Sequence, residues 1–391
     1  MLRFQTAGES HGEGLIALLS GLPAGLPVDF AYVNRELQRR MGGYGRGGRM
    51  KIESDTAHFL SGVRLGKTIG SPIAILIENR DWKNWQDALS VEERPEALAK
   101  FKPLSSPRPG HADLAGALKY NFPEARYVLE RASARETAAR VALGAMAKLF
   151  LKAFEIAVAS HTVAIGSARI SEEPVRFEEV LALRDREEIL LNCVDPEAEA
   201  RMKAEVDAAT EARDTVGGIF EVIARGVPPG LGSCAQWDER LDAALAQALM
   251  SIQAVKAVEV GRGVENATRR GSEVHDEIGY DALRRRFTRK SNRAGGLEGG
   301  ISNGEDVVVR GYLKPISTLR RPLESVDFAT RATVRAAYER SDVCVVPAAG
   351  VIGEAMVALV LARAFLEKFG GDSMDETRRN FDHYLEQLRR Y

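Results

Sequence analysis

The sequence predicts one large domain of mixed α and β structure. Short apolar segments typical of strands alternate with longer segments of helical periodicity along the whole chain of 391 residues. No Pro- or Ser-rich linker interrupts this alternation, and no segment repeats at a fixed period. The glycine-dense stretches lie between expected elements and are typical of ligand-binding loops rather than hinges between domains. We therefore expect a single domain over residues 1–391.

Apolar runs that end at turn residues predict five strands, over residues 15–22, 73–77, 156–165, 217–227 and 307–313. Apolar periodicity predicts helices from an N-cap at Asp29 to about Met41, and over 112–120, 133–154, 196–213 and 235–250. Ser133 and Glu136 have the spacing of a capping box. A further apolar run, 348–365, contains Glu354 and Arg363, which indicates a buried core helix and not a membrane span.

The composition and charge of the chain narrow the classes of function that we expect for the protein. The net charge of −1 gives no global argument for nucleic-acid or membrane partners. The three cysteines lie far apart without CxxC spacing, and the N-terminus lacks a signal-peptide pattern, so we expect a reduced, cytoplasmic protein. The basic stretch 284–293 has few aromatic neighbours, which favours a solvated or substrate-facing loop over a nucleic-acid site. Histidines outside the motifs lack metal-ligand spacing, and we predict no catalytic metal.

Two segments place a histidine beside glycine. Residues 8–12 read GESHG, where glycines permit close backbone approach and the imidazole titrates near neutral pH. The alternative is a turn in which the histidine has no catalytic role. Residues 108–113 read RPGHAD, with His111 just before an expected helix, where amide donors and the helix dipole favour an anion. Here the alternative is a simple helix cap.

Several loops combine cations with glycines or hydroxyls. Residues 42–51 read GGYGRGGRMK and suit an anionic ligand, although a flexible basic surface loop is the alternative. This loop matches neither a P-loop nor a dinucleotide-binding fingerprint. Ser133 lies between Arg131 and Arg135, as a plain N-cap or a phosphate ligand. Residues 292–304 hold two Gly-Gly pairs, which suggest close approach to a flat ligand, and 314–318 read KPIST.

Together these blocks resemble the chorismate synthase family, and the resemblance spans nearly the whole chain. The matching blocks, in family order, are GESHG at 8–12, GGYGRGGRM at 42–50, RPGHAD at 108–113, RASARET at 131–137, AGGLEGGISNG at 294–304, KPIST at 314–318 and ERSDVCVVPA at 339–348. The resemblance implies a β-α-β sandwich with antiparallel sheets around a helical layer, and a homotetramer. It also implies conversion of 5-enolpyruvylshikimate-3-phosphate to chorismate and phosphate, a 1,4-trans elimination that needs reduced FMN without net redox change.

The same resemblance implies residue roles. His11 would be the acid near the departing phosphate with Ser10 orienting it, His111 would act at the flavin N1 edge, and Asp342 near flavin N5. The implied FMN-binding residues are Arg131, Ala132, Ser133, Gln253, Ala254, Gly299, Lys314, Pro315, Ile316, Ser317, Thr318 and Arg340. We expect the substrate's phosphate and carboxylates to bind Arg40, Arg46, Arg49, Arg108 and Arg135.

Two other functions stay open at this point. Arg40 and Arg46 match positions usually assigned to a pyridine nucleotide in the family, so an NADPH-dependent flavin reductase is one alternative, as an additional or sole activity. A non-catalytic protein that binds a phosphorylated metabolite is the second. Such a binder would need the arginines but not His11, His111 and Asp342, whose presence argues against it.

Overall fold

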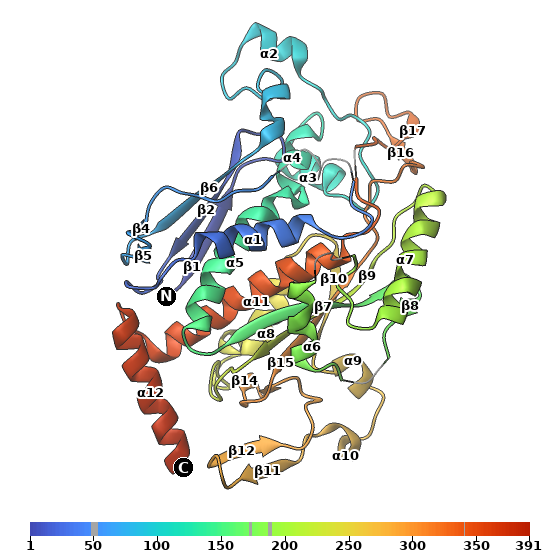
Figure 1. The fold of residues 1–391 in the computed structure, drawn as a ribbon. Helices are drawn as coiled ribbons and strands as arrows, with labels where there is room; N and C mark the ends of the chain where they lie inside the picture. Colours follow the sequence, from blue (N-terminus) through green and yellow to red (C-terminus); the bar gives the residue numbers. More distant parts are fainter. Residues whose placement is uncertain (48–53, 172–173, 187–189, 340) are drawn as a thin grey trace.

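Two antiparallel sheets enclose a layer of helices in the computed structural model, which describes residues 1–47, 54–171, 174–186, 190–339 and 341–391 (Figure 1). The strand orders are β1-β2-β6-β3 in the first sheet and β10-β15-β9-β7-β8 in the second. Helices α5 and α11 lie between the two sheets (Figure 1). This arrangement confirms the expected fold class, a mixed protein with antiparallel sheets around a helical layer.

The first sheet contains β1 (Arg3–Ala7), β2 (Gly14–Ser20), β6 (Ile73–Glu78) and β3 (His58–Phe59). Leu15 pairs with Ile77 and Leu19 pairs with Ile73, and all four side chains are buried. Their shared face is the one turned to the helices, since successive side chains of a strand point to opposite faces. Both β2 and β6 were expected from their apolar runs, and the structure confirms them.

The second sheet contains β10 (Val255–Val260), β15 (Val307–Leu313), β9 (Gly218–Arg225), β7 (Ala157–Ile165) and β8 (Ala168–Arg169). The central three strands are the ones that the sequence predicted. Inward-facing Phe220 and Val222 of β9 are fully buried. The edge strand β10 was not predicted, because its run alternates apolar residues with Lys256 and Glu259 over only six residues.

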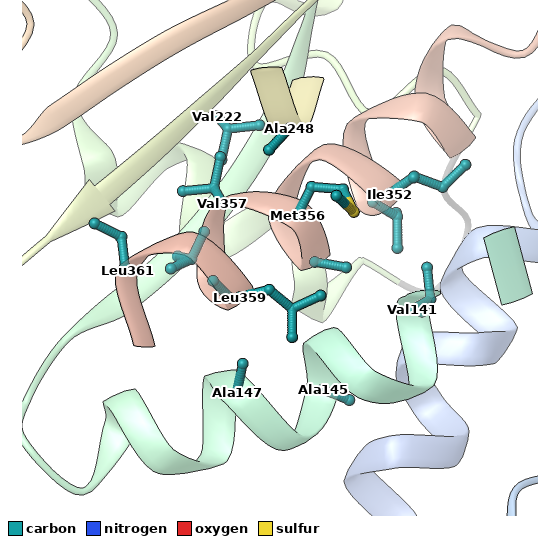
Figure 2. Packing of buried hydrophobic residues seen from close by; sticks show 14 of the residues in the cluster. Val141, Ala145, Ala147, Val222, Ala248, Ile352, Met356, Val357, Leu359 and Leu361 are labelled. Atoms are coloured by element: carbon teal, nitrogen blue, oxygen red, sulfur yellow. The ribbon is translucent and has the colours of Figure 1, made fainter. Parts of the chain in front are cut away.

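The helical layer supplies most of the hydrophobic core. It consists of α1 (Phe30–Met41), α5 (Thr137–Lys152), α8 (Leu241–Met250) and α11 (Val346–Phe369). Leu359 of α11 lies toward Ala145 and Ala147 of α5, whereas Val357 lies toward Val222 of β9 (Figure 2). Helix α11 is thus apolar on all sides because it has packed neighbours on all sides.

Helix α11 is long and apolar enough to cross a bilayer by length and composition, but most of it is buried inside the protein. Its Glu354 is 0% exposed and pairs with Arg39 of α1 at 2.8 Å and with Arg184 at 2.7 Å. Lys148 of α5 forms a third ion pair with it. The helix is therefore a core helix with an internal ion cluster, in line with the interpretation of the sequence.

Three local predictions are settled by hydrogen bonds. Asp29 caps α1, because its carboxylate accepts the N–H of Tyr32 at 2.8 Å. The capping box at Ser133 is wrong: Ser133 accepts from Arg135 N–H, and the Glu136 side chain accepts instead from Gln253. The helix predicted over 235–250 begins only at 241, because Arg240 has an extended backbone that separates it from the short 3-10 helix at Trp237–Glu239.

The remaining elements surround this frame, and the segment 80–108 carries two of them. They are β4 (Val63–Arg64), β5 (Lys67–Thr68), η2 (Arg80–Asn84), α2 (Pro95–Lys100), α3 (Asp113–Tyr120), α4 (Arg126–Ala132), η3 (Ala134–Glu136), α6 (Phe177–Ala182), η4 (Leu183–Asp185), α7 (Pro196–Glu211), η5 (Trp237–Glu239), α9 (Gly263–Asn266), α10 (Gly271–Val274), β11 (Ile278–Asp281), β12 (Arg286–Arg289), β13 (Leu297–Glu298), β14 (Ile301–Ser302), β16 (Glu324–Val326), β17 (Thr333–Arg335) and α12 (Met374–Arg390).

Candidate active site

A cavity of about 450 Å³ lies at one end of the helical layer. Its walls come from the loop after β1, the end of α1, the segments flanking α3 and α4, the turn after α8, the loop after β15 and the start of α11. It gathers most of the residues singled out in the sequence. These are Ser10, His11, Arg40, Arg46, Arg108, His111, Ala132, Ser133, Arg135, Gln253, Ala254, Lys314, Pro315, Ile316, Ser317, Thr318 and Asp342.

The first histidine is held from behind by a carboxylate. Nδ1 of His11 lies 3.0 Å from both carboxylate oxygens of Glu130 on α4, and the backbone N–H of His11 donates to Glu130 Oε2 at 2.8 Å. The indole of Trp85 packs against the imidazole, with ring centroids 4.3 Å apart. Ser10 donates to Ser133 Oγ at 3.1 Å, which joins the two serine-bearing motifs at the cavity wall.

The loop carrying His11 is fastened by one amide side chain. Nδ2 of Asn79 donates to the carbonyls of Glu9, at 3.1 Å, and of Gly12, at 2.7 Å. At Gly8 the backbone has a φ of +97°, and a Cβ there would meet the carbonyl oxygen of Gly14. Only glycine fits this combination of a positive φ and a close backbone contact. The glycine that opens the motif is therefore required by the path of the loop.

The second histidine has the same kind of support. Nδ1 of His111 lies 2.5 Å from Asp113 Oδ1, and Asp113 is fully buried at the start of α3. Arg108 donates from Nε to the other Asp113 oxygen at 2.8 Å and from Nη1 to Thr318 at 2.8 Å. Burial alone would raise the pKa of Asp113, but the hydrogen bonds from His111 and Arg108 hold it far below its usual range.

A buried carboxylate bridges two of the arginines. Asp55 Oδ2 lies 3.0 Å from Arg40 Nη2, and Arg135 Nη1 reaches both Asp55 oxygens at 2.6 and 2.8 Å. Burial, together with the positive charges of Arg135 and Arg46, lowers the pKa of Arg40 to about 10 despite the attraction of Asp55. With Arg46, Arg108 and Lys314, these arginines give the described cavity wall five cations against the three carboxylates of Asp81, Glu339 and Asp342.

Asp342 joins the glycine-arginine loop to the start of α11. Its Oδ1 accepts the N–H of Gly47 at 2.5 Å, and its Oδ2 pairs with Arg46 Nη1 at 3.2 Å. A Cβ at Gly47 would meet the carbonyl oxygen of Ser341 at 2.8 Å, so the backbones touch here. The described part of this loop thus lines the cavity and is not a free surface loop. Residues 48–51, including Arg49, lie outside the described residues, as does Arg340.

One wall combines apolar side chains with polar edges. Ile252, Leu313, Val345, Ala348 and Ile352 provide the apolar surface. Beside them, Gln253 donates from Nε2 to Glu136 at 2.8 Å, while its Oε1 is buried with no hydrogen-bond partner among the described residues. A buried amide oxygen without a partner is costly, so it marks a place for a ligand donor. A flat ring system with polar edges would fit this wall.

Two predicted flavin ligands lie elsewhere in this chain. The Arg131 guanidinium donates to the carbonyls of Gly8 and Thr6, at 3.0 and 2.9 Å, and is not among the cavity residues. Gly299 lies in the turn between β13 and β14, has a φ of +59°, and would have open space around a Cβ. Within a single chain, neither Arg131 nor Gly299 lines the cavity, and their contacts with the flavin stay predictions.

Four residues of the site were not singled out in the sequence. Glu130, Asp113, Asp55 and Trp85 all contact a predicted residue directly. Asp113 had a signal, because it stands in the RPGHAD block two residues after His111. Glu130 stands just before the RASARET block, whereas Asp55 and Trp85 have no neighbouring motif. In the described ranges, no three His, Cys, Asp or Glu side chains meet in a way that could hold a metal ion.

Comparison with known proteins agrees with this architecture. A family model for chorismate synthase matches residues 2–366. The chorismate synthases of Koribacter versatilis and Acidobacterium capsulatum are 65% and 66% identical over the whole of both chains. That of Aquifex aeolicus is 52% identical over 100% of this chain and 99% of its own. A crystal structure of a chorismate synthase matches with a TM-score of 0.79 at 43% identity, covering 100% of this chain and 99% of that one.

The fold and the comparisons define an enzyme that acts on a small molecule, and arginines and histidines line its cavity. The chain belongs to the chorismate synthase family. It is accordingly a lyase that removes phosphate from a small-molecule substrate in aromatic biosynthesis, in a family that uses a flavin cofactor.

Proposed function

We propose that this chain converts 5-enolpyruvylshikimate-3-phosphate to chorismate and phosphate by a 1,4-trans elimination, with reduced FMN and without net redox change. The observation that carries the proposal is one cavity that combines two carboxylate-backed histidines, five cations and an apolar wall. A substrate with a phosphate and two carboxylates needs several cations, and guanidinium groups bind both kinds of anion bidentately.

The arginines bind and orient the substrate in this proposal. Arg40 and Arg135 are already paired through Asp55, so they present a fixed double cation at the cavity wall. Arg108 is fixed by Asp113 and Thr318. Because their positions are set before binding, little side-chain entropy is lost when the anion arrives. We assign Arg40, Arg46 and Arg135, with Arg49, to the substrate's anionic groups rather than to a nicotinamide cofactor.

His11 donates a proton from Nε2 to the departing phosphate in this scheme. Its Nδ1 is engaged by Glu130, which leaves Nε2 as the nitrogen available to a ligand in the cavity. Ser10, hydrogen-bonded to Ser133, orients the same phosphate. A positioned acid of this kind typically contributes about 10²–10⁴-fold in rate.

The apolar wall and its polar edges fit a flavin. Gln253 Oε1 and the backbone of residues 314–318 would hold the ring edges, and Lys314 with Arg340 would meet the FMN phosphate or ring oxygens. Reduced FMN, when bound, supplies transient electron density and takes up the hydrogen that leaves the substrate ring. His111 then holds a proton at Nε2 at one edge of the ring site, and Asp342 holds or releases one at its carboxylate.

We also propose a cytoplasmic homotetramer, as the family resemblance implies. A groove of about 1190 Å³ between edge strand β1, α8 and α11 supports an interface, because it leaves the apolar side chains of Phe4 and Met1 exposed. Unpaired strand edges and apolar grooves are commonly covered in assemblies. Light scattering coupled to size-exclusion chromatography measures the assembly, and a monomer at micromolar concentration would contradict it.

The test of the proposed reaction is an anaerobic assay with 5-enolpyruvylshikimate-3-phosphate and chemically reduced FMN. We expect equal amounts of chorismate and phosphate, and no product with oxidised FMN. A second arm with NADPH and oxidised FMN asks whether the protein reduces its own flavin, which flavin absorbance reports directly. Folded protein that forms no product under fully reducing conditions would overturn the proposal.

A further inference from the structure

Both histidines of the cavity share one arrangement that neither motif reveals by itself. In each, Nδ1 faces a buried carboxylate, and the carboxylate in turn faces a buried arginine: Arg126–Glu130–His11 and Arg108–Asp113–His111. We propose that Glu130 and Asp113 are positioning residues, which act through His11 and His111 to hold each imidazole with Nδ1 on the carboxylate and Nε2 presented to the cavity as a proton donor. This inference rests on the proposed function.

Glu130 holds its histidine through more than one bond. Besides the two contacts with Nδ1, its Oε2 accepts the backbone N–H of His11 at 2.8 Å, and its own carbonyl accepts the N–H of Ser10 at 2.9 Å. The carboxylate is almost fully buried, so it has little water to share these bonds with. One residue of α4 therefore sets both the path of the GESHG loop and the orientation of its imidazole.

Trp85 restricts the remaining rotation of the His11 ring. The indole lies against the imidazole at 32° between ring planes, and its own position is supported by Lys102 and Arg126, whose cationic groups lie 4.8 and 5.5 Å from the indole centroid. A ring held at one edge by a carboxylate and on one face by an indole cannot rotate freely. The nitrogen opposite the carboxylate is then fixed toward the cavity that His11 lines.

Asp113 holds the His111 ring in the same way, through a shorter contact. The carboxylate accepts from the Arg108 backbone N–H at 3.0 Å and from two guanidinium nitrogens at 2.8 and 3.0 Å, so it is fixed before it meets the imidazole. It lies 2.5 Å from His111 Nδ1 and is fully buried. The ligand is therefore met by Nε2 and not by Nδ1.

Glu130 and Asp113 stay ionised, so each one places a negative charge beside its histidine in addition to fixing the position of the ring. Burial alone would raise the pKa of Glu130, but its hydrogen bonds with His11 and the charge of Arg126 lower it. An ionised carboxylate favours the protonated imidazole. Other charged groups near His11 are Asp81, on the same cavity wall, and Lys102 and Arg126 beside Trp85; near His111 they are Arg108 and Lys314.

The test replaces the charge and keeps the shape. In Glu130→Gln we expect kcat to fall by roughly 10²-fold with KM within about twofold, because the acid is mispositioned while the substrate's cations remain. In Asp113→Asn we expect a similar fall in kcat together with a rise in KM, because Asp113 fixes Arg108 as well as His111.

Conservative and neighbouring variants separate positioning from general damage. Glu130→Asp keeps the charge and should recover part of the lost rate, again with KM unchanged. Glu13→Gln changes an exposed carboxylate of the same loop and should leave both kcat and KM unchanged. In the wild-type protein, ¹⁵N NMR should find the neutral form of both histidines protonated at Nδ1, a result that does not depend on any variant folding.

The outcomes distinguish this inference from the proposed function. If His11→Asn retains full turnover, the acid assignment in the proposed function is wrong. If His11→Asn abolishes turnover but Glu130→Gln keeps the wild-type kcat and KM, the proposed function stands and the positioning inference is overturned. Protonation at Nε2 in the neutral wild-type histidines would also overturn it.

Discussion

Asp55 shows how a carboxylate behind the cavity can govern the binding of an anion inside it. Its side chain is fully buried between Arg40 and Arg135 and compensates charges that would otherwise repel each other. Burial alone would raise the pKa of Asp55, but the two arginines hold it below its usual range. The carboxylate therefore keeps two guanidinium groups close together in the absence of substrate.

Removal of this charge should destabilise the protein, and an anion in the cavity should repair part of the loss. In Asp55→Asn we expect the free energy of unfolding to fall by about 3–5 kcal/mol, because a buried partner is lost. We also expect inorganic phosphate to raise the Tm of this variant more than that of the wild type, since phosphate replaces the missing negative charge. Thermal unfolding with and without phosphate measures both effects.

Asp87→Asn is the matched control, because Asp87 pairs with Lys100 at 2.7 Å at the protein surface. A surface pair contributes little, so its Tm and phosphate response should equal those of the wild type. An Asp55→Asn protein as stable as the wild type would show that the bridge contributes nothing.

At the residue scale, the sequence could identify the groups that face the ligand but not the ones that support them. His11 and His111 stand in glycine-bearing motifs, and Asp342 stands in the block ERSDVCVVPA, so each has a local signal. Glu130 and Asp55 reach their partners across 119 and 80 positions of the chain. Such contacts exist only after α4, α1 and the first sheet have packed together. No spacing rule within a short window can report them.

At the scale of elements, α5 and α11 approach each other very closely where they cross in the core. At Gly144 of α5 an added Cβ would lie 2.2 Å from the Cβ of Ala355 and 2.4 Å from its Cα. Ala355 belongs to the buried middle of α11, which has neighbours on all sides. Neither helix can move away without opening the core elsewhere, because protein interiors are close-packed.

Gly144→Ala should therefore destabilise the protein although alanine favours helices. We expect the free energy of unfolding to fall by about 1–3 kcal/mol, the usual cost of overpacking. Chemical denaturation measures the change. The control is Gly271→Ala in α10, where an added Cβ would meet His275 no closer than 3.6 Å and stability should not fall. Equal stability of wild type and Gly144→Ala would mean that the helices can separate freely.

The elements that the sequence predicted are those with strong local signals. Helix α1 has its N-cap at Asp29, and strands β6 and β15 have apolar runs between turns. The sequence predicted the start of α8 too early. Ala235 is a residue type that is common in the helix itself, but Arg240 has an extended backbone and the helix begins after it. Strand β10 exists because β15 pairs with it. Its own six residues alternate too weakly to predict it, so tertiary pairing and not propensity decided this element.

At the scale of the whole molecule, buried ionised carboxylates lie in the helical layer, in the second sheet and in the site. Glu354 and Glu36 lie among the cations of the helical layer, Glu221 lies on β9 between His161 and Arg310, and Asp113 lies in the site. Burial by itself would raise the pKa of each, but the cationic partners and hydrogen bonds lower it, in Glu221 to about 2.

These shifts predict a protein that is stable near neutral pH and loses stability in acid. A carboxyl whose folded pKa is depressed contributes stability above its unfolded pKa, and the contribution is lost as the pH falls through the folded pKa. The decline should begin near pH 4.5, the ordinary range for glutamate, and for Glu221 continue to about pH 2. That residue alone accounts for about 3 kcal/mol across the interval.

Urea unfolding from pH 7 to pH 3 measures this decline, and a variant assigns part of it. Glu221→Gln should be less stable than the wild type at pH 7, because His161 and Arg310 lose their anion. Its stability should also fall less steeply below pH 4.5, since it has one fewer depressed carboxyl to protonate. Glu211→Gln, at the exposed end of α7, should follow the wild-type curve. A wild-type stability that stays level between pH 5 and pH 3 would contradict the argument, because buried carboxylates held ionised by cations cannot bind protons without loss of those ion pairs.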